Sequence, residues 1–98
     1  MVPIRPSEVK AWCIERDFHP NRTLGQNFLI DRNILEAIAA AAGLPPRAAV
    51  LEVGPGLGAM TQALLEAGAH VTAVEKDHRL AEWLRGALGA NQRFTLIE

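Results

Sequence analysis

The stretch Val50-Leu51-Glu52-Val53-Gly54-Pro55-Gly56-Leu57-Gly58 decides the fold of this chain. A short apolar run that breaks into closely spaced glycines predicts a buried strand, a tight turn and the start of a helix. Glycines leave the backbone bare, and the first turn of the helix offers free N–H groups, so such a turn suits a nucleotide-type ligand. A second acid, Glu75, ends the next apolar run. A right-handed crossover brings Glu75 beside the first strand, within reach of ribose hydroxyls.

The glycines alone leave the type of cofactor open. The pattern Gly54-x-Gly56-x-x-Ala59 satisfies the loose dinucleotide fingerprint, and Glu75 follows at about the offset of ~20 residues expected for that class. A tight strand-to-helix turn without any ligand is the plain structural alternative, because glycine also serves turns that bind nothing.

Three details favour S-adenosylmethionine over a dinucleotide. Glu52 lies inside the first strand, a third glycine follows at Gly58, and a long segment precedes the strand. A carboxylate near the strand end suits a cationic amino acid better than a pyrophosphate, because opposite charges attract. We therefore expect S-adenosylmethionine as the cofactor.

Residues 1–46 are predicted to form a helical extension ahead of the sheet. A short helix begins at Pro6, and a second is expected to run from Asp31 to Ala42. The break at Pro45-Pro46 marks the boundary between this extension and residues 47–98, which we expect to be the first half of a cofactor-binding domain.

Residues 47–98 predict a β-α-β-α-β unit, which is an α/β half-sheet with parallel strands. Strands in this fold pair in the order 3-2-1, which leaves the first strand at an open edge. Its apolar residues Val50, Leu51 and Val53 are typical of a central strand covered on both faces, and an exposed edge there would invite aggregation. We therefore expect the front part of a longer protein, cut after its third strand. The expected elements are a strand Ala49–Val53, a helix Ala59–Ala67, a strand His70–Val74, a helix Arg79–Leu88 and a strand Phe94–Ile97.

The composition is that of one small globular domain. The 98 residues are 49% hydrophobic and 21% charged, and the net charge of -1 neither demands nor forbids a nucleic-acid partner. The single cysteine, Cys13, excludes an internal disulfide and indicates a reducing compartment. His19 and His70 have no companion at metal-ligand spacing, so we expect no metal. Because no apolar run is long enough for a signal peptide or a membrane span, we expect a cytoplasmic protein.

Three segments together resemble one family. They are Leu24-Gly25-Gln26-Asn27-Phe28-Leu29, the turn segment Leu51–Gly58, and the Glu-x-Asp-x-x-Leu run Glu75–Leu80. In this order they resemble the small-subunit rRNA adenine dimethyltransferases, which methylate two adjacent adenosines, and the likeness covers the whole chain. Large-subunit resistance methyltransferases share the fold, but Gly25 and the Gly-Pro-Gly-Leu-Gly form look more like the small-subunit enzymes.

The resemblance implies a Rossmann-like class I S-adenosylmethionine-dependent methyltransferase fold and a set of cofactor contacts. It implies that the extension wraps over the methionine end of the cofactor, that the turn contacts the cofactor through its backbone, and that an acid holds the ribose hydroxyls. Asn27 is able to hydrogen-bond the amino-acid group without adding charge. The alternatives are that Asn27 stabilises a turn and that Phe28 and Leu29 pack in the core; we favour binding for Asn27 and packing for Phe28. The implied cofactor-binding residues are Gln26, Asn27, Leu29, Gly54, Gly56 and Glu75.

The resemblance also implies an activity and a partner. It implies dimethylation of the N6 amines of two adjacent adenosines in small-subunit rRNA during ribosome maturation, by an enzyme that is monomeric at full length. The family's acceptor loop and adenine-binding Asp follow the third strand and lie outside Met1–Glu98, so we expect part of a cofactor pocket here and no complete catalytic set. The rivals are a nucleotide-dependent oxidoreductase, which leaves Gln26–Leu29 unexplained, and a non-catalytic RNA-binding assembly factor of the same fold.

The remaining aromatic and charged residues predict structural roles. Trp12 and Trp83 have apolar neighbours at helical positions, so we expect packing rather than base stacking. Asp77 is expected to cap the helix that follows it. The basic residues of the extension alternate with acids, which predicts a mixed solvated surface rather than a basic patch.

Overall fold

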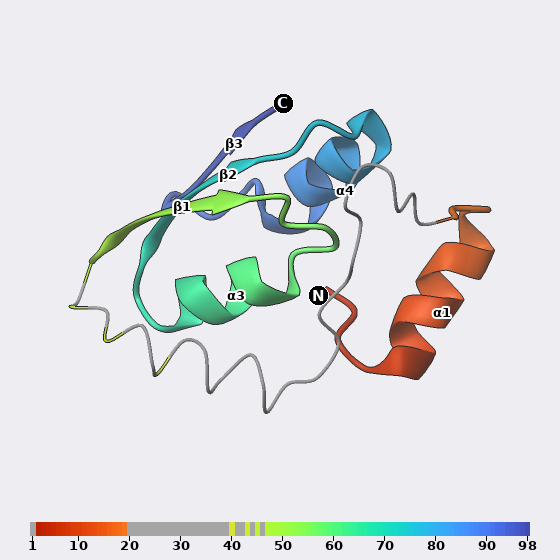
Figure 1. Ribbon diagram of the computed structural model, residues 1–98, viewed down its shortest axis with the longest axis horizontal. Helices are drawn as coiled ribbons and strands as arrows, with labels where there is room; N and C mark the ends of the chain where they lie inside the picture. The colour runs from red at the N-terminus through yellow and green to blue at the C-terminus, as the bar shows by residue number, and fades with distance from the viewer. Residues whose placement is uncertain (1, 20–39, 41–42, 44, 46) are drawn as a thin grey trace.

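A computed structural model describes residues 2–19, 40, 43, 45 and 47–98 (Figure 1). The expected helix from Asp31 and the segment Leu24–Leu29 therefore lie outside the described residues. The described elements agree closely with the predicted ones, with shifts of one residue at helix ends. They are α1 (Pro6–Glu15), β1 (Ala49–Val53), α3 (Ala59–Glu66), β2 (His70–Val74), α4 (His78–Leu88) and β3 (Phe94–Ile97).

The three strands form one parallel sheet in the order β1-β2-β3, which confirms the predicted order and leaves β1 at an edge. β1 pairs with β2 along its whole length, with Val53 opposite Val74. β2 pairs with β3 from Val71, which lies opposite Phe94, to Val74. Successive strands step across the sheet in one direction, and right-handed crossovers then place both connecting helices on the same face.

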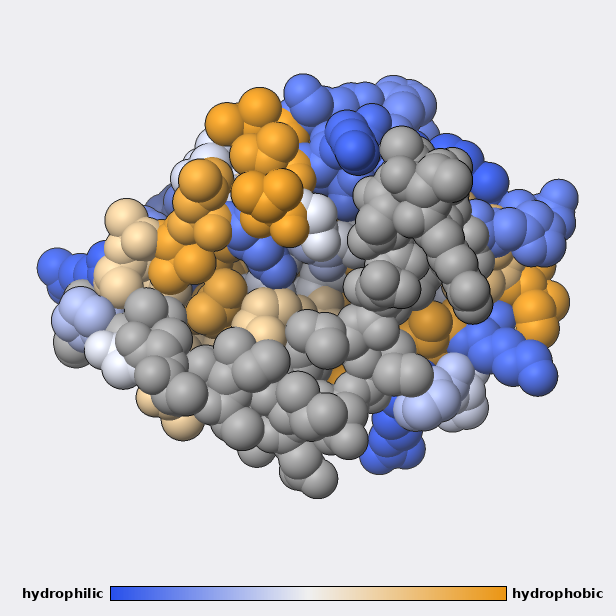
Figure 2. Space-filling view, in the orientation of Figure 1, coloured by the Kyte–Doolittle hydropathy of each residue, from blue (hydrophilic) through white to orange (hydrophobic). Residues whose placement is uncertain are grey.

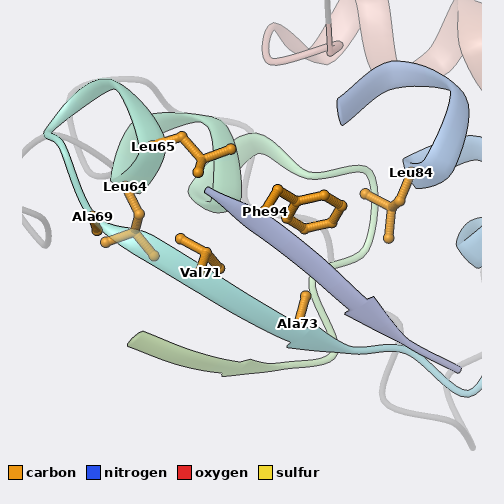
Figure 3. Packing of buried hydrophobic residues seen from close by; sticks show 7 residues of the cluster. All are labelled: Leu64, Leu65, Ala69, Val71, Ala73, Leu84 and Phe94. Atoms are coloured by element: carbon orange, nitrogen blue, oxygen red, sulfur yellow. The ribbon is translucent and has the colours of Figure 1, made fainter. Parts of the chain in front are cut away.

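The main core lies between that face and the helices α3 and α4. Leu64 and Leu65 come from α3, Leu84 comes from α4, and the strands supply small and aromatic side chains opposite them (Figure 3). Because side chains alternate along a strand, only every second residue of each strand enters this core. The cluster comprises Leu64, Leu65, Ala69, Val71, Ala73, Leu84 and Phe94.

The other face of the sheet is uncovered in the described part of the chain. Leu51 is 68% exposed, Val53 77% and Ile97 50%. Figure 2 shows apolar side chains gathered over the strands on this side. The expectation that Val50, Leu51 and Val53 belong to a strand covered on both faces in a longer protein stays a prediction. In the described residues, Val50 packs against the core, whereas Leu51 and Val53 face away from both helices and are exposed. The cause is the crossover geometry, which puts α3 and α4 together on one side.

The described part of the extension packs against the sheet unit. α1 begins at Pro6, and the backbone N–H of Arg5 donates to the Glu8 carboxylate at 2.9 Å, which satisfies one free donor at the helix start. A second core cluster joins Trp12 and Phe18 from the N-terminal side to Leu57 and Leu80. The prediction that the tryptophans serve packing agrees with these contacts.

Candidate cofactor site

The site is built on the turn between β1 and α3, which in Figure 1 bends away from the sheet edge before entering α3. Gly54 has a φ of +69°, in the left-handed region that favours glycine, and a Cβ added there would meet no atom within 4 Å. Its N–H donates to the carbonyl of Val74 at 2.9 Å, which continues the β1–β2 pairing by one residue. The backbone at Gly54 is thus held by the sheet on one side and open on the other.

Gly58 closes the turn and is required for a different reason. It is the N-cap of α3, with a φ of +92°. A Cβ at this position would lie 3.0 Å from Leu84 Cδ2 and 3.1 Å from Leu88 Cδ1, both on α4. The left-handed φ favours glycine here, and a side chain would in addition crowd the two leucines of α4.

Glu75 lies one residue past β2, at the same end of the sheet as the glycine turn. Its backbone N–H donates to the carbonyl of Ile97 at 2.9 Å, and its Oε2 accepts from the N–H of Asp77 at 2.9 Å. The residue is only 4% exposed. These bonds hold the buried Glu75 carboxylate next to Val74, whose carbonyl accepts the N–H of Gly54. The sequence predicts this position of Glu75 beside the first strand.

Glu52 points to the side of the sheet that α3 covers. Its Oε1 accepts from the hydroxyl of Thr61 at 2.5 Å, and Thr61 is fully buried. Burial raises the pKa of Glu52 above its usual value, and the hydrogen bond from Thr61 opposes that rise. In the described residues Glu52 thus connects β1 to α3 through a hydrogen bond that the sequence does not predict.

Two further hydrogen bonds hold the segments next to the glycine turn and Glu75. The Asp77 side chain accepts from the N–H of Leu80 at 3.1 Å and caps α4, as predicted. The indole Nε1 of Trp83 donates to the carbonyl of Leu57 at 3.1 Å. The second contact joins α4 directly to the glycine turn and was not predicted, because nothing in the local sequence shows which backbone oxygen a tryptophan reaches.

The structure brings together three of the six predicted cofactor-binding residues. Gly54, Gly56 and Glu75 all lie beyond the carboxyl ends of β1 and β2. Gln26, Asn27 and Leu29 lie outside the described residues. The carboxyl ends of parallel strands are where open α/β sheets bind their ligands, so the three described residues stand where a cofactor is expected.

In the parts of the chain that the structure describes, no three His, Cys, Asp or Glu side chains gather as metal ligands. Among the same residues, no helix has the length and apolar character needed to cross a bilayer.

A parallel sheet with a glycine turn after its first strand and a buried acid after its second defines the nucleotide-binding half of a Rossmann-like fold. Residues 17–98 match the family model for ribosomal RNA adenine dimethylase. The chain belongs to this family.

Individual proteins similar to this chain are methyltransferases by name. Ribosomal RNA small subunit methyltransferase A of Deinococcus radiodurans is 52% identical and is matched over 83% of this chain and 29% of its own length. The solved structure of the 23S rRNA methyltransferase ErmE is 42% identical with a TM-score of 0.66, over 72% of this chain and 29% of that one. The glycopeptide N-methyltransferase MtfA, solved with sinefungin, is 27% identical with a TM-score of 0.60, over 67% and 28% of the two chains. The chain thus spans under a third of the length of these proteins.

Proposed function

We propose that this chain carries the glycine-turn part of the S-adenosylmethionine site of an rRNA adenine N6-dimethyltransferase. The main support is the placement of Gly54 and Glu75 at the ends of adjacent parallel strands. The Gly54 N–H donates to the carbonyl of Val74, the residue before Glu75, at 2.9 Å. Family membership supports the same reading.

Two features of the described residues suit this cofactor. The space beside Gly54, where a Cβ would meet nothing within 4 Å, lets a ligand approach the backbone. Glu75 offers a fixed carboxylate, which suits two vicinal ribose hydroxyls as donors. When bound, S-adenosylmethionine supplies an electrophilic methyl group on a sulfonium. Gln26, Asn27 and Leu29 are proposed to contact its methionine end, as the family resemblance implies.

The role of these residues in the reaction is alignment. Transfer of a methyl group to an adenine N6 is an in-line displacement, which depends on how donor and acceptor are held more than on a strong base. Gly54 and Gly56 set the position of the cofactor through the backbone, and Glu75 fixes its ribose. The adenine must leave its stack to reach the methyl group, so the RNA-binding part of the enzyme has to extrude it.

Small-subunit rRNA is the substrate we favour. The relative from Deinococcus radiodurans is named for the small subunit and is 52% identical, against 42% for ErmE, which is named for 23S rRNA. The 23S rRNA is therefore the second candidate, supported by that structural likeness.

The nucleotide-dependent oxidoreductase and the non-catalytic assembly factor have less support than the dimethyltransferase. MtfA binds sinefungin, an analogue of S-adenosylmethionine, and its likeness to this chain favours that cofactor over NAD. A non-catalytic assembly factor of the same fold would keep the turn and Glu75 while lacking transfer activity.

The test is methyl transfer by the product of the complete gene. S-adenosylmethionine with a labelled methyl group is incubated with unmethylated small subunits and, separately, with unmethylated 23S rRNA. We expect label in N6,N6-dimethyladenosine of the small-subunit rRNA at two adjacent positions. Label in 23S rRNA alone would replace the proposed substrate, and S-adenosylmethionine binding without any transfer would favour the assembly factor.

A further inference from the structure

The peptide that joins Leu57 to Gly58 is held at both of its polar groups. Its carbonyl accepts from Trp83 Nε1 at 3.1 Å, and its N–H donates to the carbonyl of Pro55 at 3.0 Å. Leu57 is 3% exposed, so water gives little alternative to these bonds. Rotation of this peptide would break both bonds, which fixes its plane.

This peptide also sets the start of α3. Gly58 is the N-cap, and its own carbonyl accepts from the N–H of Gln62 at 2.8 Å. The first N–H groups of a helix have no partner within the helix and bind anionic or polar ligand groups where a glycine turn leads into them. The direction of those donors therefore depends on the plane of the Leu57–Gly58 peptide.

The Trp83 ring packs against the N-terminal helix α1 and the residue that follows it. The rings of Trp12 and Trp83 meet edge to face, with centroids 5.4 Å apart and planes at 71°. The guanidinium of Arg16 lies 5.0 Å from the Trp83 ring centroid and 4.7 Å from that of Trp12. These contacts hold the indole of Trp83 in the orientation that aims its N–H at Leu57.

The two tryptophans differ in one atom's environment. Trp83 Nε1 has the Leu57 carbonyl as its acceptor, whereas the buried Trp12 Nε1 has no hydrogen-bond acceptor among the residues that the structure describes. A change of either residue to phenylalanine keeps an aromatic ring and removes an N–H. Only at Trp83 does this change remove a bond to the turn.

We infer that Trp83 is a positioning residue of the cofactor site, which acts through the Leu57 carbonyl to hold the glycine turn and the start of α3 in their ligand-binding geometry. The inference rests on the proposed function, because it takes the turn to be the S-adenosylmethionine site. It assigns a role in cofactor affinity to the Trp83 side chain on α4, whereas Trp12 contributes only an aromatic ring against Trp83, which Trp12→Phe retains.

The experiment compares Trp83→Phe with Trp12→Phe in the complete gene product. S-adenosylmethionine affinity is measured by calorimetric titration, the thermal midpoint by scanning calorimetry, and the backbone amides of the ligand-free protein by 15N-labelled NMR. We expect Trp83→Phe to weaken binding by about three- to tenfold, the scale of one hydrogen bond, and to move the Gly58 amide signal. Trp12→Phe should stay within about twofold of the parent.

The outcomes separate this inference from the proposed function. Equal affinity of Trp83→Phe and the parent, or equal losses in both variants, would overturn the positioning role and leave the proposed function standing. Failure of the parent to bind S-adenosylmethionine would overturn both. Should Trp83→Phe fail to fold, 3-benzothienylalanine at position 83 repeats the test, because sulfur replaces the N–H in a ring of the same shape.

Discussion

Gly54 donates its N–H to the Val74 carbonyl at 2.9 Å, one residue beyond the last pair of the β1–β2 ladder. This bond fixes the start of the glycine turn against the strand that ends in Glu75. The two features that the sequence suggests for a cofactor site, a bare turn and a buried acid, are thus joined through a single backbone bond.

The two glycines Gly58 and Gly68 allow backbone strain to be separated from packing. Their φ values are +92° and +94°, but an added Cβ meets α4 side chains at Gly58 and nothing within 4 Å at Gly68. We expect Gly68→Ala to cost about 1–2 kcal/mol of unfolding free energy from the left-handed conformation alone. Gly58→Ala should cost about 1–3 kcal/mol more from overpacking. Urea denaturation measures both, and equal losses would contradict the packing role of Gly58.

Glu52 should make stability depend on pH in the direction opposite to an ordinary ion-paired acid. Its pKa is raised in the folded protein, chiefly by burial. The folded state therefore binds the proton more tightly than the unfolded chain, and stability falls as pH rises from the usual value of 4.5 through the raised value. Glu52→Gln should remove this fall, and Thr61→Val should enlarge it because the opposing hydrogen bond is lost. Denaturation midpoints of the parent and the two variants across this pH range test the prediction. Identical pH profiles for the parent and Glu52→Gln would contradict the role of Glu52.

The pKa of His78 should depend on its contact with Glu98. Its Nδ1 lies 2.6 Å from Glu98 Oε2, and this hydrogen bond, with the charge of Glu98, raises the pKa of His78 above its usual value. Glu98→Gln should bring the pKa of His78 down in an NMR titration of its ring protons. Glu82→Gln should lower it less, because Glu82 acts only by charge and as a smaller cause. An unchanged titration of His78 in Glu98→Gln would show that the contact is absent in solution.

Asp77 should stabilise α4 as its cap. The carboxylate accepts from the N–H of Leu80 at 3.1 Å, so Asp77→Ala should cost about 1 kcal/mol of unfolding free energy. Asp77→Asn retains the accepting oxygen and should cost much less. Thermal unfolding of the three proteins distinguishes the cap from a purely electrostatic effect, which would make the two variants equally unstable.

Local signals in the sequence predict most of the fold. The glycines after Val53 and the apolar runs of the strands fix the element bounds, and the crossover rule predicts the strand order with β1 at an edge. The cap at Asp77 follows from its place before a helix.

The contacts between elements could not be predicted in the same way. Glu52 and Thr61 meet because α3 packs on the β1 side that carries Glu52, and Trp83 reaches Leu57 because α4 packs against the turn. These pairings depend on how helices settle on the sheet, which short sequence patterns do not encode. The covering of Leu51 and Val53 expected in a longer protein stays a prediction, because an apolar run alone does not show whether one face or two are covered.

The most direct measurement of the central claim is calorimetric titration of S-adenosylmethionine and, separately, NAD into the complete gene product and its Glu75→Ala variant. We expect saturable binding of S-adenosylmethionine alone, weakened by ~1–3 kcal/mol in the variant, which is the scale for loss of a charge-assisted hydrogen-bond partner. Binding of NAD in place of S-adenosylmethionine, or equal S-adenosylmethionine affinity in the two proteins, would contradict it.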